Sequence, residues 1–513
     1  MKKRILALFL VLLMCLPLAI ACKKNEESEE PETTELVEDS ATESVETETF
    51  INDEDTLGEY DFGGKDYKIL TRASTEYEFY SEEGLKGNVL NREIYNRNKK
   101  VEARFNVKIV TDPQSGDWTK QEPMVTALRN DILTGEQGYS LVSGHTLIIA
   151  PLTLENLATD LTALPEFDPT KAWWSKLMYD EINLEGKMLY TVGDITATLY
   201  EYLEVMFVNE TLFNNLYGKD GVDLFQLVED GEWTWEKYTE FAKGYGLGNT
   251  AEEVSYGALI NVHSWRAGLI GEEVQIATKN ESNGHFEIPD APSEKLLEVL
   301  DEMNEFYKLN NIYFANNDGT DEKASNKIFA SGKALFYGQT LMNASSLRND
   351  MNDTYGLIPQ PKYDEFQETY LTNCRDSVSA IMVPNTSKNT QTDSEMIGVV
   401  TEALCMYSYQ DVVPAYYEVT MQRQYFNSQR YVDILNMVRE GLTFDYAFAW
   451  FYGDLKSATG GGNPYDQIGR GCFGINGKSE KDPAAQYATY KDKWANYLDY
   501  CYGQMEVYGI IGE

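Results

Sequence analysis

Residues 65–144 alternate between short apolar segments and longer amphipathic ones, and this alternation constrains the fold more than any other feature of the chain. Segments typical of strands are KDYKILTR (65–72), NVKIV (106–110) and YSLVSG (139–144). Segments with apolar residues at helical spacing are NREIYNRNKKVEARF (91–105) and PMVTALRNDILTG (123–135). Strands that alternate with helices predict an α/β fold with a parallel sheet. In such sheets, ligands bind outside the carboxyl ends of the strands.

Two loops that follow predicted strands are therefore the first candidates for ligand contact. TRASTEYEFY (71–80) contains Tyr77 and Glu78, and SGHTL (143–147) contains Gly144 and His145. Aromatic rings and polar side chains of these types bind flat, hydroxyl-rich ligands. The alternative for His145 is a surface loop residue without a ligand.

The N-terminus predicts export. Lys2, Lys3 and Arg4 precede the apolar stretch ILALFLVLLMCLPLAI, which is too short for a stable membrane span, and small residues lead to Cys22. This arrangement resembles a bacterial lipoprotein signal, with residues 1–21 as the signal peptide and Cys22 as the lipidated N-terminus on the outer face of the cell membrane. The alternative is an ordinary secretory signal with a coincidental cysteine.

The segment after Cys22 is strongly acidic. Residues 23–60 hold 15 Asp or Glu against two Lys and almost no aromatic residue. Such a composition cannot bury enough apolar surface to offset the entropy of ordering the chain. We expect residues 22–62 to be a disordered tether.

Charge and length bound the function of the rest. The chain has 43 Lys+Arg against 83 Asp+Glu, so nucleic acid is excluded as a partner and neutral solutes are favoured over anionic ones. The roughly 450 residues beyond the tether exceed one hydrophobic core and predict two lobes. Cys374, Cys405, Cys472 and Cys501 are too far apart for a CxxC motif, and either disulfides or, with slight preference, buried thiols are expected.

From residue 185 onward, six segments occur in an order found in one known family. They are EGKMLYTVGD (185–194), LEVMFVNETLF (203–213), GEWTWEKYTEF (231–241), IFASGKALFYGQT (328–340), YGLIPQPK (355–362) and SAIMVPNTSKN (379–389). This order is similar to that of the extracellular solute-binding proteins of bacterial ABC importers, in the family-1-like, sugar-binding branch. The resemblance is weakest over 270–320 and 455–490.

The resemblance implies a periplasmic-binding-protein-like fold of type II. Each lobe is a mixed or parallel sheet flanked by helices, and a hinge joins the lobes. Lobe one would take residues 63–196 and 374–430, and lobe two residues 197–370 and 431–513. The family implies that a carbohydrate binds between the lobes and that the protein delivers it, as a monomer, to the permease subunits of an ABC importer.

The resemblance also implies further ligand contacts. Asp194, Tyr200 and Tyr202 fall where the chain first crosses the hinge, and Arg375 begins the return crossing. Lobe two would offer Trp265 and Arg266 in HSWRAG, Tyr337 and Gln339 after KALFY, and Trp450 and Tyr452 in YAFAWFYGD. The alternatives are an ion pair at the hinge for Arg375 with Asp376, and a place in the core for the aromatic residues near 450.

Catalysis and metal binding find little support. The chain has three histidines, no HExxH motif, no paired Cys/His spacing and no G-x-S-x-G. We expect no metal, no cofactor and no enzymatic activity; a surface glycoside hydrolase, a sensor module or a binder of another solute remains the alternative. In GEWTWEKYTEF, Thr234 is a good N-cap, so we expect Trp233 and Trp235 to hold a helix start rather than a sugar.

Overall fold

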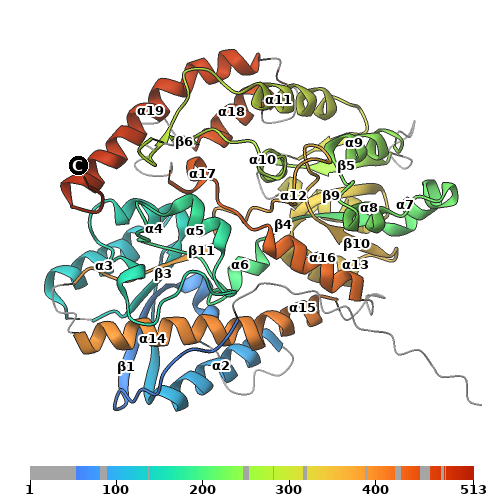
Figure 1. Ribbon diagram of the computed structural model, residues 1–513. Helices are drawn as coiled ribbons and strands as arrows, with labels where there is room; N and C mark the ends of the chain where they lie inside the picture. Colours follow the sequence, from blue (N-terminus) through green and yellow to red (C-terminus); the bar gives the residue numbers. More distant parts are fainter. Residues whose placement is uncertain are drawn as a thin grey trace, which may run out of the picture. The chain divides into compact units, whose positions relative to one another are not determined.

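The computed structural model (Figure 1) describes most of the chain beyond the acidic segment. The described residues are 53–80, 89–136, 138–246, 254–280, 282–315, 320–386, 391–421, 429–450, 463–474, 479 and 481–512. The signal peptide, Cys22 and Tyr452 lie outside them.

The first sheet has four strands in the order β11-β3-β1-β2. The strands are β1 (Lys65–Arg72), β2 (Val107–Gln114), β3 (Leu141–His145) and β11 (Ser379–Met382). β1 is parallel to β2 and β3, while β11 joins β3 antiparallel after a long excursion of the chain. Ile69 and Leu70 are both fully buried on opposite faces, which explains the continuous apolar sequence of β1.

The second sheet has five strands in the order β10-β4-β9-β5-β8. The strands are β4 (Glu204–Asn209), β5 (Tyr256–Ile260), β8 (Ile312–Phe314), β9 (Ala334–Thr340) and β10 (Tyr355–Ile358). β5 is parallel to β8 and β9, and β4 is antiparallel to β9 and β10. A small hairpin of β6 (Thr278–Lys279) and β7 (Phe286–Glu287) stands apart from both sheets. Below, lobe one and lobe two denote the elements built on the first and the second sheet; the predicted residue boundaries between the lobes stay a prediction.

Helices cover both sheets (Figure 1). Along lobe one and its connections lie α2 (Val89–Phe105), α3 (Glu122–Thr134), α4 (Thr146–Thr153), α5 (Lys176–Ile182), α6 (Ala197–Glu201), α14 (Gln391–Tyr407) and α15 (Val413–Met421). Along lobe two lie α7 (Glu210–Leu216), α8 (Leu224–Glu229), α9 (Trp235–Lys243), α10 (Val262–Gly271), α11 (Glu294–Tyr307), α12 (Thr320–Ala330) and α13 (Ala344–Asp350). The C-terminal helices are α16 (Gln429–Glu440), α17 (Tyr446–Trp450), α18 (Pro464–Phe473) and α19 (Pro483–Val507). Short helical turns are η1 (Ala73–Glu78), η2 (Leu161–Ala163), η3 (Gly218–Asp220), η4 (Leu341–Asn343) and the π turn η5 (Ser408–Val412).

The strand and helix predictions for residues 65–144 are confirmed, with boundaries that differ by a few residues. β1 matches the predicted strand, and α3 ends at Thr134 with Gly135, the last residue of the predicted helix, as its C-cap. Gly135 has a φ of 62°, a left-handed conformation that glycine adopts without strain, and its N–H bonds to Asp131 O.

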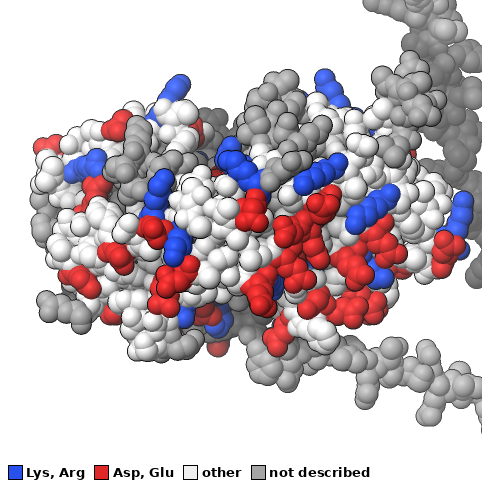
Figure 2. All heavy atoms as spheres, turned by 90° about the horizontal axis from the view of Figure 1, so that it is seen from above, with Lys and Arg blue, Asp and Glu red and all other residues white. Residues whose placement is uncertain are grey.

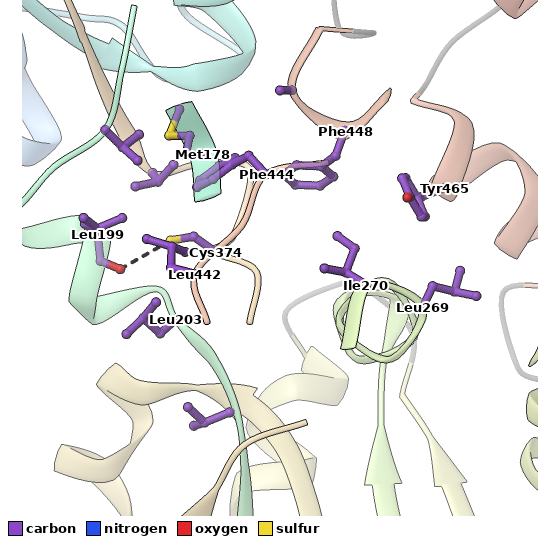
Figure 3. Packing of buried hydrophobic residues seen from close by; sticks show 14 of the residues in the cluster. Met178, Leu199, Leu203, Leu269, Ile270, Cys374, Leu442, Phe444, Phe448 and Tyr465 are labelled. Atoms are coloured by element: carbon purple, nitrogen blue, oxygen red, sulfur yellow. Dashed lines mark hydrogen bonds between the residues drawn. The ribbon is translucent and has the colours of Figure 1, made fainter. Parts of the chain in front are cut away.

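One continuous apolar cluster runs through the connections between the two sheets. Figure 3 shows Leu199 and Leu203 of the first crossing near Cys374 of the return crossing, whose thiol lies 3.4 Å from Leu199 O. Met178 of α5 and Ile270 of α10 belong to the same cluster. Apolar packing therefore contributes to holding the crossing segments together.

Trp233 and Trp235 are structural, as expected. Trp233 is fully buried and donates from Nε1 to Pro359 O (3.1 Å), and Trp235 is 5% exposed and packs against Phe306. Thr234 caps α9 by accepting from Lys237 N.

The expectation that the disordered tether reaches residue 62 is wrong for its last ten residues. Arg104 binds Asp55 and donates to Leu57 O (2.9 Å), while Lys171 donates to Glu54 O (2.9 Å). Phe62 is 6% exposed. The apolar and aromatic residues near 57–62 bury enough surface to order this segment on lobe one.

The four remaining cysteines are free and buried, so the preferred expectation of buried thiols is confirmed. On the surface, acidic side chains gather into one patch on the face shown in Figure 2.

Candidate functional site

Polar side chains converge at the carboxyl ends of β1 and β3, beside the return crossing at 375–379. β1 ends at Arg72 and continues into η1, and β3 ends at His145. Because these strands are parallel neighbours, their carboxyl ends lie at one edge of the first sheet. We call the polar groups at this edge the sheet-one site.

Arg72 is the cation of the sheet-one site. Its Nη2 donates to Ser377 O (2.9 Å) and to Ser379 Oγ (2.8 Å), which fixes the guanidinium against the return crossing. Its Nη1 lies 3.8 Å from the carboxylate of Asp117. The side chain is 4% exposed, and the buried Nε–H has no protein partner in the described part of the chain.

Four further buried polar atoms of the sheet-one site lack a hydrogen-bond partner among the described residues. They are Thr71 Oγ1, Thr75 Oγ1, Glu78 Oε2 and Ser143 Oγ. Each belongs to a residue no more than 3% exposed. A buried polar group without a partner costs about 1–3 kcal/mol. Five such atoms at the ligand-binding edge of one sheet therefore indicate a site that water or a bound solute satisfies.

His145 lies beside the one exposed tryptophan of the chain. Seven of the eight tryptophans are at most 5% exposed, whereas Trp118 is 44% exposed. Its ring centroid lies 6.2 Å from that of His145. Burial and the charge of Arg72 lower the His145 pKa to about 4, so the imidazole is neutral at pH 7. Its Nδ1 accepts from Leu147 N (3.3 Å), which leaves the proton on Nε2.

Two carboxyl groups connect the sheet-one site to the first crossing. Glu78 Oε1 accepts from Thr198 N (2.8 Å) and from Thr198 Oγ1 (2.7 Å). Tyr77 donates its hydroxyl to Glu201 Oε2 (2.5 Å). Burial raises the Glu201 pKa to about 7, with a further contribution from Glu78. Tyr202 is partly buried, and burial raises its pKa.

On the lobe-two side, the charged groups are already paired. Arg266 donates to Asp376 Oδ2 (2.8 Å), lies 3.5 Å from Asp466 Oδ2, and contacts His263 Nδ1 (2.5 Å). Burial alone would raise the Asp376 pKa, but Arg266 and His263 hold it well below the usual range. Arg375 bonds to Glu204 Oε1 (2.9 Å) and to Gln339. Arg375 therefore forms an ion pair with Glu204, and Asp376 forms one with Arg266. Both agree with the alternative interpretation of these residues as ion pairs at the hinge.

Half of the predicted contact residues lie around this region, and most of the others fill the interior. Those around it are Tyr77, Glu78, His145, Tyr202, Arg266, Gln339 and Arg375.

Three predicted sugar platforms are instead core rings. Trp265 is fully buried between Phe314 and Phe473. Tyr337 is 1% exposed, and Trp450 is 2% exposed and packs edge-on against Tyr190. Their ring faces are covered by protein, so the expectation that they stack on a solute is not met in this structure.

Three further predicted residues are also buried, and their contact with a solute stays a prediction. A Cβ at Gly144 would lie 2.8 Å from Met124 Cε, so this glycine allows close packing. Asp194 is 2% exposed and bound to Arg439, and Tyr200 is 2% exposed and packs on Tyr416. Tyr452 and Cys22 lie outside the described residues.

The sequence analysis does not single out Arg72 or Trp118 as candidate ligand contacts. Arg72 is the last residue of a predicted strand, at the carboxyl end where ligands bind. Trp118 stands in the polar stretch GDWTK, and a large aromatic residue among polar neighbours after a strand is the signal that points to it.

Metal chemistry finds no support in the described residues, where no group of three or more His, Cys, Asp or Glu side chains could hold an ion. Within the same residues, no helix is long and apolar enough to cross a membrane. Two surface cavities on lobe two, of about 450 and 630 Å³, share no residue with the sheet-one site.

Comparison with solved structures identifies the fold. A sugar transporter protein from Rhizobium etli in an open conformation is 12% identical, with a TM-score of 0.53 and coverage of 84% of this chain and 98% of that one. A cyclo/maltodextrin-binding protein complexed with maltotetraose is 13% identical, with a TM-score of 0.50 and coverage of 88% and 99%. A cyclic alpha-maltosyl-1,6-maltose binding protein from Arthrobacter globiformis is 12% identical, with a TM-score of 0.50 and coverage of 87% and 99%.

No protein-family model and no curated protein matches the sequence. The structural matches nevertheless span nearly the whole of each binding protein, so the chain has their two-lobed α/β fold, of the type II periplasmic-binding-protein kind. The fold class predicted from the sequence is confirmed.

Proposed function

We propose that this protein captures a neutral carbohydrate at the sheet-one site and delivers it to the permease of an ABC importer. One observation carries the proposal. At the carboxyl ends of β1 and β3 and in the turn η1 that follows, five buried polar atoms have no partner among the described residues, and the exposed Trp118 lies beside His145.

A sugar ring matches these groups chemically. Its apolar face stacks on an indole, here that of Trp118, and its hydroxyl groups both donate and accept hydrogen bonds. Glu78 Oε2 offers an acceptor, Arg72 Nε offers a donor, and the hydroxyls of Thr75 and Ser143 offer both. The nearby charges of Arg72 and Asp117 oppose each other, which favours an uncharged ligand.

Three solved proteins of this fold agree with the proposal by their names. One is described as a sugar transporter, one as a maltodextrin-binding protein with maltotetraose, and one as binding cyclic alpha-maltosyl-1,6-maltose. By extension, we propose that this protein also binds its ligand and does not catalyse a reaction.

The proposed location combines the fold with the N-terminal sequence. The lipoprotein-like signal and Cys22 support export and lipid anchoring at the outer face of the cell membrane. In this proposal the protein works as a monomer beside its permease. Mass spectrometry of the mature N-terminus, with lipid on Cys22 as the expected result, tests the anchor.

Isothermal titration calorimetry of the full chain with neutral oligosaccharides, maltotetraose included, tests the sugar assignment. We expect binding, and we expect Trp118→Ala to weaken it by about 5- to 10-fold because an aromatic stacking contact is worth about 1 kcal/mol. Phe366→Ala is the matched control: this residue is 92% exposed, lies on lobe two and touches no part of the sheet-one site.

The alternatives give different results in the same assay. Binding of amino acids or peptides but of no sugar would overturn the carbohydrate and leave the importer role. Release of product from an oligosaccharide, abolished by Glu78→Gln, would instead support a surface hydrolase.

A further inference from the structure

The C-terminal end of the chain is firmly attached to lobe two. α18 packs on α10 and α11, and α19 packs on α18, α11 and β7. Trp494 of α19 donates from Nε1 to Gln467 of α18 (2.6 Å), and the Tyr487 hydroxyl donates to Pro289 O (2.7 Å). α19 is therefore attached to lobe two along much of its length, while α17 before it packs on α4 and α5 of lobe one.

The last described residues nevertheless bind lobe one. Lys187 Nζ donates to Ile510 O (2.5 Å) and to Gly509 O (3.3 Å), and Gly512 N donates to Glu185 Oε2 (3.0 Å). Glu185 and Lys187 belong to the tight turn at 183–187, in which Leu184 pairs with Lys187. The chain after this turn pairs with β11 through Thr191, so the turn is part of lobe one.

The C-terminal residues are held in one conformation before they meet this turn. Gly509 has a φ of 66°, its N–H bonds to Glu506 O (2.9 Å), and Ile510 N bonds to Met505 O (2.7 Å). This is a Schellman cap, and it directs Ile510 and Ile511, which are 7% and 5% exposed, into the apolar cluster. The terminal residues thus form a rigid extension of α19 rather than a loose end.

Further contacts beside this junction also join the C-terminal region or lobe two to lobe one. The His285 ring stacks on Tyr502 of α19 (4.4 Å between centroids), and its Nε2 lies 3.4 Å from Glu185 Oε1. Ser175 at the start of α5 donates to Leu442 O (2.9 Å), and Figure 3 shows Phe444 and Phe448 between Met178 and Ile270.

We propose that residues 509–512 and the turn at 183–187 form a clasp that restrains the separation of the two lobes. Hydrogen bonds between 2.5 and 3.3 Å are lost when their atoms move apart by about 1 Å, so a hinge opening that carries α19 away from the turn must break them. The clasp adds a noncovalent connection to the chain crossings of the hinge. It sets how often the lobes open in the absence of a solute.

Hydrogen–deuterium exchange of the full, solute-free chain measures this opening directly. We compare wild type with Lys187→Met, which keeps the aliphatic stem but removes the donors, and with deletion of residues 509–513. We expect exchange of the amides at 187–192 and 444–450, which lie beside the junction of the lobes, to become about 10-fold faster in Lys187→Met, because a lost hydrogen bond to a charged group shifts the open population by at least about that factor. The deletion should have the larger effect, since it also removes two buried isoleucines.

The control is Lys176→Met on the same lobe. Lys176 is 72% exposed, pairs only with Asp180 one turn along α5, and has no partner on lobe two among the described residues. The Lys176→Met variant should show the same amide exchange at 187–192 and 444–450 as wild type. β9 in the middle of sheet two reports on global stability and should not change in Lys187→Met.

Two results would overturn the clasp. One is unchanged exchange at 187–192 and 444–450 in both variants, and the other is an equal acceleration at β9, which means general destabilisation. If the deletion fails to fold, Lys187→Met alone decides. Since no sugar is added, the result is independent of the proposed ligand.

Discussion

The two lobes differ in the aromatic side chains that they present to the region between them. The sheet-one site has an exposed tryptophan, Trp118, whereas the lobe-two side covers its aromatic rings and pairs Arg266 with Asp376. Both sides hold buried polar atoms without a partner among the described residues, Trp265 Nε1 and Asp466 Oδ1 included, so these atoms do not distinguish the lobes. An exposed indole can stack on a solute without a rearrangement of the core. Lobe one is therefore the lobe that we expect a solute to meet first.

The largest expected effect compares one residue type in the two regions. Trp265→Ala should lower the free energy of unfolding by about 3–5 kcal/mol, because it leaves a cavity among Phe314 and Phe473. Trp118→Ala should change it by about 0.5 kcal/mol or less, because the side chain is 44% exposed. Urea unfolding followed by circular dichroism measures both. Similar losses of unfolding free energy in the two variants would contradict the expected difference between the two regions.

The next effect tests the paired charges of lobe two. Arg266→Met should destabilise the fold by about 2 kcal/mol at pH 7, since it leaves the partly buried Asp376 without its main partner. The Asp376 pKa is lowered in the folded state, so its stabilising contribution is present above the unfolded pKa of about 4 and is lost as pH falls towards the folded value.

The difference between Arg266→Met and wild type should therefore shrink between pH 7 and about pH 3. Asp376→Asn in the Arg266→Met background is the control and should restore part of the stability at pH 7. A penalty that does not depend on pH would show that packing, rather than charge, dominates.

A smaller effect concerns the carboxyl group at the first crossing. The Glu201 pKa is raised from 4.5 to about 7, so its favourable contribution is complete below the unfolded value and is lost as pH rises through about 7. Wild type should lose about 2 kcal/mol between about pH 4.5 and 7.5 from this group, a figure reduced for its partial exposure. Glu201→Gln should flatten that part of the stability curve, as thermal melts across this pH range would show. An unchanged slope would contradict the assignment.

A small effect on stability is also expected at Glu78. Glu78→Gln keeps the oxygen that accepts from Thr198 and replaces the unpartnered Oε2 by an amide nitrogen. The free energy of unfolding should therefore change by about 1 kcal/mol or less. Affinity for the sugar that binds in calorimetry should nevertheless fall by about 5-fold or more, since an acceptor of the site is lost. Equal affinity in the variant would remove Glu78 from the proposed contact set.

The sequence predicts the fold well because its signals are local. Apolar spacing in 65–144 and Gly135 at a helix end determine strands and helices from neighbouring residues alone. The location of the sheet-one site at the carboxyl ends of parallel strands is also predictable, and Tyr77, Glu78 and His145 lie at those ends; their contact with a solute stays a prediction.

Solvent exposure of single rings is different, because distant segments decide it. Trp265 is covered by Phe473, which lies more than 200 residues later, and Trp118 stays open because no described residue covers it fully. Only this tertiary context determines which of the two tryptophans is exposed. The sequence alone therefore points to Trp265 and not to Trp118.

The ordered segment at 53–62 has a mechanical consequence. Arg104 and Lys171 hold it to lobe one, near the end of α2. A force applied at the start of this segment therefore reaches lobe one before it reaches lobe two. Movement of lobe two relative to lobe one would leave both of these contacts in place, because both cations belong to lobe one.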